Sequence, residues 1–228
     1  MRERLEILCP EGTVRTLADG MWALERAAVA HSRDLCIDYD RMLAEFGCLW
    51  MLVRCRLRMK RLPAGELRVQ TWLRRPGAAA SVRDFVLFEG GEEIGTAVQS
   101  WVLADAKERK LVNLKTVAPL WTLPTPMPER TELLRRLQLP ETAPAAEWLI
   151  KPEEIDENGH LNNVAYVRRA EALVPGGCNA LEVIFDRECF AGETLRLETA
   201  ADDAFYVRGV KTTGEESVRL RFWKEEWQ

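Results

Sequence analysis

The stretch Asp156-Glu157-Asn158-Gly159-His160-Leu161-Asn162-Asn163-Val164-Ala165-Tyr166 is the one around which this chain is organised. Gly159 permits a tight turn, and either Asn162 or Asn163 is a good N-cap, so we expect a turn followed by a helix over residues 162–174. The apolar residues of that run recur at helical spacing: Val164, Val167, Ala170 and Leu173. The stretch therefore predicts a polar loop that leads directly into a helix packed on a core.

Three polar side chains with different chemistry stand at alternate positions of the loop: Asp156, Asn158 and His160. They lie just before a helix N-terminus, where backbone N–H groups and the helix dipole favour an oxyanion. We interpret them as candidate catalytic residues. The alternative is a structural turn in which Asp and Asn only satisfy backbone groups and cap the helix.

The pattern Asp-x-Asn-x-His-x-Asn-Asn-x-x-Tyr resembles the signature of the acyl-acyl carrier protein thioesterases, both the plant plastid enzymes and their bacterial relatives. Residues 183–189 (Val-Ile-Phe-Asp-Arg-Glu-Cys), followed by Ala-Gly-Glu at 191–193, resemble the strand that carries the family's Glu-Cys pair. A looser resemblance covers residues 24–31, Trp50 and residues 54–61.

The resemblance implies a catalytic set made of Asp156, Asn158, His160, Glu188 and Cys189. We assign substrate contacts to four further residues: Asn162, Asn163, Trp50 and His31. For His31, a packed or hydrogen-bonded helix histidine is the simpler interpretation.

The order of predicted elements indicates an α+β fold. A helix over 17–33 and a short helix over 39–46 precede strand-like segments at 53–59, 67–74, 81–88 and 94–104, after a short strand at 3–9. This plan of a helix followed by an antiparallel meander fits the hotdog fold, in which a curled sheet wraps one helix. Six of the eleven prolines fall in residues 119–144, which predicts a linker interrupted by a short helix at about 130–137.

The plan then repeats, with a strand at 148–150, the helix at 162–174 and strands at 180–188, 194–200, 204–212 and 217–224. We therefore predict a tandem (double) hotdog. Its parts are a non-catalytic N-terminal domain (1–118) that holds the acyl-chain pocket, a proline-rich linker (119–145) and a catalytic C-terminal domain (146–228).

The repeat is visible in the residues themselves. Gly12 matches Gly159, and Ala-Gly-Glu at 64–66 matches the same triplet at 191–193. In that register the first copy has other residues in place of the polar set: Cys9, Glu11, Thr13 and, opposite Glu188, Arg61. A single catalytic site per chain follows.

Composition limits the function further. The net charge of −4 argues against general nucleic-acid binding, and no apolar run approaches the ~18 residues that span a membrane. The six cysteines show no Cys-x-x-Cys spacing, which is typical of free thiols in a reducing compartment, and no signal segment begins the sequence. We expect a cytoplasmic protein that is either monomeric or homodimeric. With two histidines and scattered cysteines, we expect neither a metal nor a cofactor.

The predicted function is hydrolysis of fatty acyl-acyl carrier protein to the free fatty acid and the holo-carrier protein. In this interpretation Glu188 activates water, Asn158 binds the carbonyl oxygen or the water, His160 assists proton transfer and Asp156 orients its neighbours. Cys189 is then a small buried residue, although it can also be read as a nucleophile. Three alternatives stay open: an acyl-CoA thioesterase, a hydratase or dehydratase of the same fold, and a non-catalytic acyl-thioester sensor.

The partner implied is an acidic carrier protein whose acyl group hangs on a phosphopantetheine arm. Alternation in the strand 53–59 places Arg54, Arg56 and Arg58 on one face, which makes an outward arginine stripe a candidate docking surface. Internal pairing of these arginines with the many acidic residues is the competing interpretation.

Overall fold

The computed structural model describes residues 3–121 and 129–227. Three α-helices are found there, α1 (Leu17–Asp34), α2 (Tyr39–Phe46) and α3 (Asn163–Glu171), with single 3-10 turns at Leu114–Thr116, Ala118–Trp121 and Pro152–Glu154. The strands are β1 (Leu5–Cys9), β2 (Cys48–Met59), β3 (Leu67–Leu73), β4 (Ser81–Glu89), β5 (Glu92–Asp105), β6 (Leu111–Val112), β7 (Ala143–Leu149), β8 (Ala180–Phe185), β9 (Thr194–Ala201), β10 (Phe205–Lys211) and β11 (Glu216–Trp223). None of the helices described is long and apolar enough to cross a membrane.

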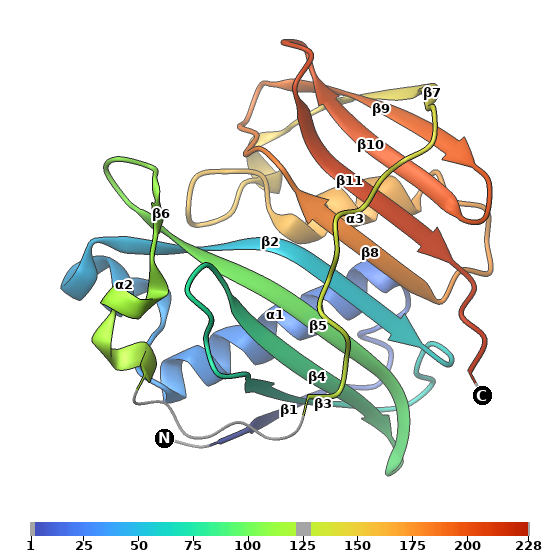
Figure 1. The fold of residues 1–228 in the computed structure, drawn as a ribbon. Coiled ribbons are helices and arrows are strands. Elements are labelled where there is room, and N and C mark those ends of the chain that lie inside the picture. The colour runs from blue at the N-terminus through green and yellow to red at the C-terminus, as the bar shows by residue number, and fades with distance from the viewer. Residues whose placement is uncertain (1–2, 122–128, 228) are drawn as a thin grey trace.

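The strands form one antiparallel sheet with the order β1-β3-β4-β5-β2-β8-β11-β10-β9-β7, and β6 pairs with β5. Read outward from the centre, the two halves have the same order: β2, β5, β4, β3, β1 in the first and β8, β11, β10, β9, β7 in the second. Each half curls around one helix, α1 or the shorter α3 (Figure 1). The predicted tandem hotdog is therefore confirmed, with two copies fused edge to edge.

The contact region between the two halves, which we call the seam, has two layers. In the sheet, β2 pairs antiparallel with β8, from Arg54 opposite Ile184 to Arg58 opposite Ala180. Beneath it α1 packs on α3, and the carboxylate of Glu171 accepts hydrogen bonds from the backbone N–H groups of Leu17 (2.8 Å) and Ala18 (2.9 Å). The last turn of α3 thus caps the first turn of α1, where a negative charge also meets the positive end of the helix dipole.

Helix α1 buries the apolar stripe expected from its spacing, including Leu17, Met21 and Leu24, against the inner face of the sheet. Gly20 brings the helix close to β2, because a Cβ at this position would lie 2.7 Å from Leu57 Cδ2. Along β2, Cys55, Leu57 and Met59 are fully buried while the arginines between them face outward. The residues of α1 that line a cavity lie farther along the helix, from its middle to its C-terminal end.

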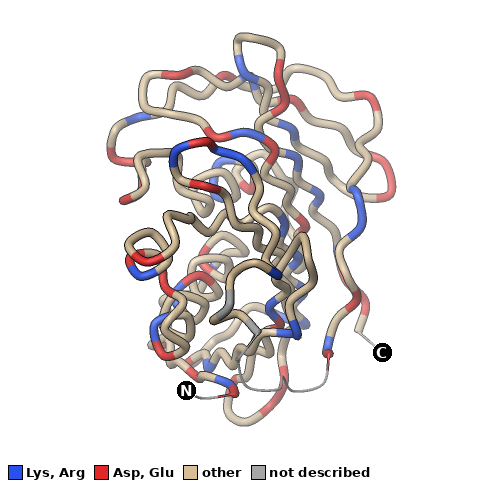
Figure 2. Tube along the Cα trace, turned by 60° about the vertical axis from the view of Figure 1, so that its left-hand side comes forward, with Lys and Arg blue, Asp and Glu red and all other residues tan. Residues whose placement is uncertain are grey.

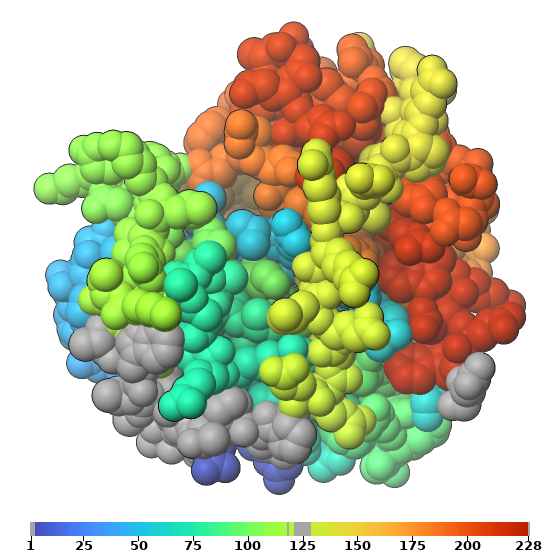
Figure 3. Space-filling model, viewed as in Figure 1, coloured from blue at the N-terminus to red at the C-terminus, as the bar shows by residue number. Residues whose placement is uncertain are grey.

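The segment before β7 differs from the prediction. Residues 130–137 form no helix; the chain runs extended over the outer face of the sheet (Figure 3). Its carbonyl groups are bound by sheet arginines, Arg54 Nη1 to Leu134 O at 3.0 Å and Arg219 Nη1 to Leu137 O at 2.8 Å. Three prolines of the predicted linker lie outside the described residues: Pro124, Pro126 and Pro128.

The arginine stripe faces outward as expected, but its charges are paired internally. Arg56 forms an ion pair with Glu182 on β8 at 2.9 Å, and Arg58 forms one with Glu225 at 3.3 Å. Together with the contact of Arg54 to the covering segment, these pairs support the competing interpretation of the stripe. Over the rest of the chain, both signs of charge are interspersed along the trace (Figure 2).

Candidate active site

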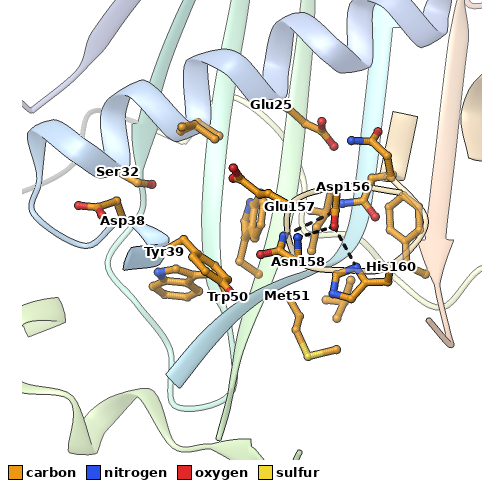
Figure 4. A pocket seen from close by; sticks show the side chains of 18 of the residues that line it. Glu25, Ser32, Asp38, Tyr39, Trp50, Met51, Asp156, Glu157, Asn158 and His160 are labelled. Atoms are coloured by element: carbon orange, nitrogen blue, oxygen red, sulfur yellow. Dashed lines mark hydrogen bonds and ion pairs between the residues drawn. The ribbon is translucent and has the colours of Figure 1, made fainter. Parts of the chain in front are cut away.

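A cavity of about 550 Å³ lies between α1, the start of β2, the loop 156–163 and the segment 185–188. Its lining includes seven of the nine site residues that the sequence predicts: Asp156, Asn158, His160, Asn162, Asn163, Glu188 and Trp50. The apolar part of the wall comes from both halves, with Met51, Leu52 and Phe185 among its members. In Figure 4 the polar residues of the loop lie at one end of the group of lining residues, while Ser32 on α1 and Asp38, the N-cap of α2, lie at the other.

The polar loop is a closed turn held by its own backbone. Ile155 and Leu161 form an isolated antiparallel bridge, and the N–H of Asp156 donates to the carbonyl of His160 at 2.9 Å. Gly159 has φ +84°, a conformation that side-chain-bearing residues rarely adopt, so glycine is needed here. The turn therefore presents its polar side chains in one fixed arrangement.

Asp156 lies between the other two polar residues of the motif. Its Oδ1 accepts a hydrogen bond from the backbone N–H of Asn158 at 2.8 Å and lies 3.7 Å from His160 Nδ1. The side-chain amide of Asn158 donates to Oδ2 at 3.5 Å. The position of Asp156 is therefore suited to orienting both Asn158 and His160.

His160 joins the motif to Glu188. Its Nε2 lies 3.5 Å from Glu188 Oε1, so the imidazole stands between two carboxylates. A histidine in this position can carry a proton from one carboxylate side to the other. The four side chains assigned to catalysis by water activation thus form one contiguous group on the cavity wall.

Glu188 reaches this position from a loop, not from a strand as the segment 180–188 predicts, because β8 ends at Phe185. The loop is attached to the motif by a backbone hydrogen bond from Leu161 N to Cys189 O at 2.8 Å. Glu188 also pairs with Arg109, whereas its neighbour Arg187 lies 3.6 Å from Glu215. Glu188 and its neighbour Arg187 are therefore paired with different residues.

The N-terminus of α3 contributes less than its sequence suggests. Asn162 is the N-cap, and its Oδ1 accepts from the N–H of Val164 at 2.8 Å, while its backbone carbonyl accepts from Ala165 at 3.0 Å. These two N–H groups are consequently unavailable to an oxyanion.

Two predicted residues lie outside the lining of the cavity. Cys189 is fully buried, burial raises the pKa of its thiol, and its Sγ contacts Ser217 Oγ at 3.0 Å. Since Ser217 donates to the carbonyl of Arg187, the thiol is the donor in this contact and is held as a thiol. His31 is buried too, and its Nδ1 accepts a hydrogen bond from Arg83 at 2.8 Å, so it is the hydrogen-bonded helix histidine of the simpler interpretation.

Several charged residues of the cavity region were not found from sequence, Glu25, Arg83 and Arg109 among them. Glu25 and Arg83 line the cavity, and Arg109 holds Glu188 from the hairpin that follows β5. Glu25 had a signal, because Glu25, Ala28, Val29 and Ser32 follow the spacing i, i+3, i+4, i+7 and form the face of α1 that lines the cavity. Arg83 is fully buried and burial lowers its pKa to about 9.

The equivalent turn of the first half resembles the motif in backbone conformation but carries different side chains. Gly12 has φ +74°, close to the value at Gly159, and the central helix of the half follows in both cases. Thr13 donates its hydroxyl to the carbonyl of Pro10 at 2.6 Å, and Glu11 is exposed. Neither residue lines the cavity.

Comparison with known proteins agrees with the resemblance seen in the motif. Residues 12–117 match the family model of the acyl-ACP thioesterase N-terminal domain, where ACP is acyl carrier protein. No curated protein matches the sequence significantly.

Among solved structures, an acyl-ACP thioesterase from Bacteroides thetaiotaomicron superposes with a TM-score of 0.82 at 20% identity, over 96% of this chain and 97% of that one. The 12:0-ACP thioesterase from Umbellularia californica gives 0.79 at 17% identity, over 100% of this chain and 98% of that one. A MaoC-like dehydratase from Phytophthora capsici gives 0.53 at 12% identity, over 78% and 72% of the two chains. At these identities the structural likeness shows the double-hotdog fold, and the family match confirms the predicted resemblance and a thioester hydrolase.

Proposed function

Starting from a double hotdog whose first half matches the acyl-ACP thioesterases, we propose that this chain hydrolyses a fatty acyl-ACP to the free fatty acid and the holo-carrier protein. The observation that carries the proposal is the His160 imidazole held between Asp156 and Glu188 in the wall of a 550 Å³ cavity with a partly apolar lining. A cavity with a partly apolar lining beside an acid–base group is what cleavage of an acyl thioester needs.

In the proposed reaction Glu188 accepts a proton from water, and the water oxygen attacks the thioester carbonyl carbon. Asn158 donates to the carbonyl oxygen as it becomes negative. His160, oriented by Asp156, carries a proton to the departing sulfur, so that the C–S bond breaks and the carrier leaves as its thiol. Cys189 takes no covalent part, because its thiol lies behind the cavity wall and is held protonated.

For the carrier protein we propose a docking surface on the β5–β6 hairpin. Its tip carries Lys107, Arg109 and Lys110, all exposed, and it projects beside the loop that holds Glu188 (Figure 3). Lys107 makes no ion pair within residues 3–121 and 129–227, and the pair of Lys110 with Glu108 is almost fully solvated. Such cations suit an acidic partner that must deliver its arm to the cavity next to them.

The activity is tested by measuring thiol release from acyl-ACP and acyl-CoA substrates of graded chain length. Hydrolysis of acyl-ACP with a higher kcat/KM than the matching acyl-CoA supports the proposal. Preference for acyl-CoA would assign the chain to the acyl-CoA thioesterases. Hydration of an enoyl thioester without thiol release, or binding without turnover, would overturn hydrolysis itself.

Charge reversal tests the docking surface separately. Lys107→Glu with Lys110→Glu should raise KM for acyl-ACP in a salt-sensitive way and change KM for acyl-CoA much less. The matched control is Arg135→Glu with Arg136→Glu, two exposed arginines of the segment on the outer sheet face. Equal effects of the two double variants would remove the hairpin from the carrier-binding surface.

A further inference from the structure

Arg83 places a buried positive charge in the wall of the cavity, at the end away from the polar loop. It belongs to β4 and is only 2% exposed to solvent, yet it lines the cavity. Its side chain points inward to α1, because Nη1 donates to His31 Nδ1 at 2.8 Å and Nη2 donates to Ser32 Oγ at 3.1 Å. Both acceptors lie near the C-terminal end of α1, whereas Glu25, about two turns earlier, points toward the polar loop (Figure 4). The cavity therefore runs from the polar loop to a cation.

The hydrogen bonds of Arg83 leave its charge uncompensated. Its third acceptor is Thr71 Oγ1, 3.3 Å from Nη1, so all three partners are neutral groups. Within residues 3–121 and 129–227 Arg83 forms no ion pair, whereas Arg74, a second buried arginine, binds Asp84 through Nε at 2.7 Å and Nη2 at 2.9 Å. On Arg83 the same two atoms each keep one N–H group that no described residue accepts. Burial lowers the pKa of Arg83 to about 9, so the group is charged at neutral pH, and an unpaired buried charge is costly.

Gln99 adds a second donor without an acceptor on the same side of the sheet. It lies directly opposite Arg83 on β5, so the two side chains share the inner face. Gln99 is fully buried, and its Oε1 accepts a hydrogen bond at 3.1 Å from the indole of Trp101, which lines the cavity. Its Nε2 has no hydrogen-bond partner in the described part of the chain, and Cys55, its neighbour on β2, offers only a weakly accepting thiol. The inner face around Arg83 thus has more donors than acceptors.

We infer that Arg83 is a specificity-determining residue for the proposed hydrolysis, on which this inference rests: it binds a carboxylate at the far end of the acyl chain, so that the substrate class is an ω-carboxyacyl thioester. A carboxylate supplies both the acceptors and the negative charge that this end of the cavity lacks. It also matches the fork of a guanidinium with two parallel hydrogen bonds, as in the contact of Arg74 with Asp84. A chain that ends in a methyl group would leave the charge of Arg83 buried and unpaired.

The length of the cavity limits which chains can make this contact. In Figure 4 Glu25 points toward the polar loop, and Ser32, which binds Arg83, follows seven positions later on α1. At the rise of an α-helix the two ends are about 10 Å apart along the axis. A shorter chain leaves its carboxylate beside apolar lining residues such as Ala28 and Leu52, and a longer chain has to fold back. We therefore expect the carboxylate to be favoured over a narrow range of chain lengths.

The test compares pairs of thioesters of equal chain length, one ending in a methyl group and the other in a carboxylate, over graded lengths. Both are carried on the thiol carrier that the wild type hydrolyses better. In the wild type, kcat/KM for the carboxylate-ended substrate should exceed that for the methyl-ended one at the matching length and not at shorter ones. Arg83→Met removes the charge and keeps an unbranched side chain, so this ratio should fall by at least about 30-fold, the effect of truncating one partner of a buried charge pair.

The matched control is Arg26→Met, an exposed arginine on α1 that does not line the cavity; it should keep the wild-type ratio. Circular dichroism checks that the variants fold. If Arg83→Met does not fold, Arg83→Gln, which keeps a donor for His31 and carries no charge, gives the same comparison.

Binding of free acids gives a readout that does not require turnover. Calorimetric titration with an α,ω-dicarboxylic acid and with the monocarboxylic acid of the same length should show tighter binding of the dicarboxylic acid by the wild type. In Arg83→Met this difference should be lost, whereas Arg26→Met should retain it.

The outcomes separate this inference from the proposed function. If thiol is released but the wild type favours methyl-ended chains at every length, or Arg83→Met leaves the ratio unchanged, the role of Arg83 is wrong and hydrolysis stands. If the wild type releases no thiol from any thioester, hydrolysis itself is wrong. The titration with the dicarboxylic acid then decides by itself whether Arg83 binds a carboxylate.

Discussion

At the residue scale, the site depends on contacts that reach Glu188 from three directions. His160 approaches from the motif, Arg109 from the hairpin of the first half, and the carbonyl of Glu188 accepts a hydrogen bond from Lys211 at 3.1 Å. A carboxylate bound in this way has a defined position, which a base that activates a single water needs. The neighbouring Cys189 does not face the cavity; its thiol is buried and enclosed by Ser217 and Tyr166.

This contrast gives the first mutational prediction. Glu188→Gln, His160→Ala and Asn158→Ala should each lower kcat by about 10²- to 10⁴-fold, the usual cost of one acid–base or polarising group. Cys189→Ser should keep most of the activity, since serine preserves the size and the donor of the buried thiol. Steady-state thiol release, with circular dichroism as the check on folding, measures all four. Normal rates in Glu188→Gln together with loss of activity in Cys189→Ser would establish a cysteine nucleophile instead.

At the scale of elements, local sequence determined most boundaries and tertiary contacts determined the exceptions. Helix α2 has the predicted bounds because Asp38 caps its start and Gly47, at φ +61°, ends it. The segment 130–137 has helix-forming residues, yet it binds the sheet through the carbonyls of Leu134 and Leu137. The carbonyl of Leu134 would accept a backbone hydrogen bond within a helix over 130–137, whereas that of Leu137, at its end, would not. No short-range pattern indicates the two arginines that bind these carbonyl groups.

In the candidate site, too, some features follow from local sequence and others from tertiary contacts. The motif loop could be read from sequence because its turn, its cap and its chemistry are contiguous. Glu188 was found by resemblance but assigned to a strand. The strand β8 ends earlier, where the backbone N–H groups of Asp186 and Arg187 both donate to the carbonyl of Ser217 on the neighbouring strand. Arg109 is 79 positions away from Glu188 in the sequence, so its contact with Glu188 could not be predicted without the fold.

The cap between the central helices gives a prediction about stability. Glu171→Ala removes the acceptor of two N–H groups at the start of α1 and should lower the free energy of unfolding by about 1–2 kcal/mol. Glu171→Gln keeps one neutral acceptor and should cost less. Urea unfolding measures the series, with Glu66→Gln, an exposed glutamate, as the neutral control. A Gln variant as unstable as the Ala variant would show that the charge, and not the hydrogen bond, carries the effect.

At the scale of the whole molecule, the first half supports a site whose polar motif belongs to the second. It supplies the cavity face of α1, the start of β2 and the hairpin that reaches Glu188. Its own turn, around Gly12, has no part in the cavity lining. The predicted division into a pocket-bearing half and a catalytic half stays a prediction, and the ion pair of Arg109 with Glu188 joins the first half to the loop that the second half contributes.

The turn around Gly12 is the place to test the single-site interpretation. Glu11→Ala, Cys9→Ala and Thr13→Ala should change kcat by less than about threefold, because these residues do not touch the cavity. A loss comparable to that of His160→Ala, in variants that remain folded, would mean that the first turn also takes part in the reaction.

The pairing of β2 with β8 also has a consequence for stoichiometry. Two identical hotdog subunits joined at such a seam carry every residue twice, so a change that opens a pocket beside one turn opens it beside the other. In a single chain each copy varies independently, so one turn can lose its polar residues while the other keeps them. Calorimetric titration with a non-hydrolysable thioether analogue of the substrate should therefore saturate at one equivalent per chain, where a symmetric pair of subunits would take two.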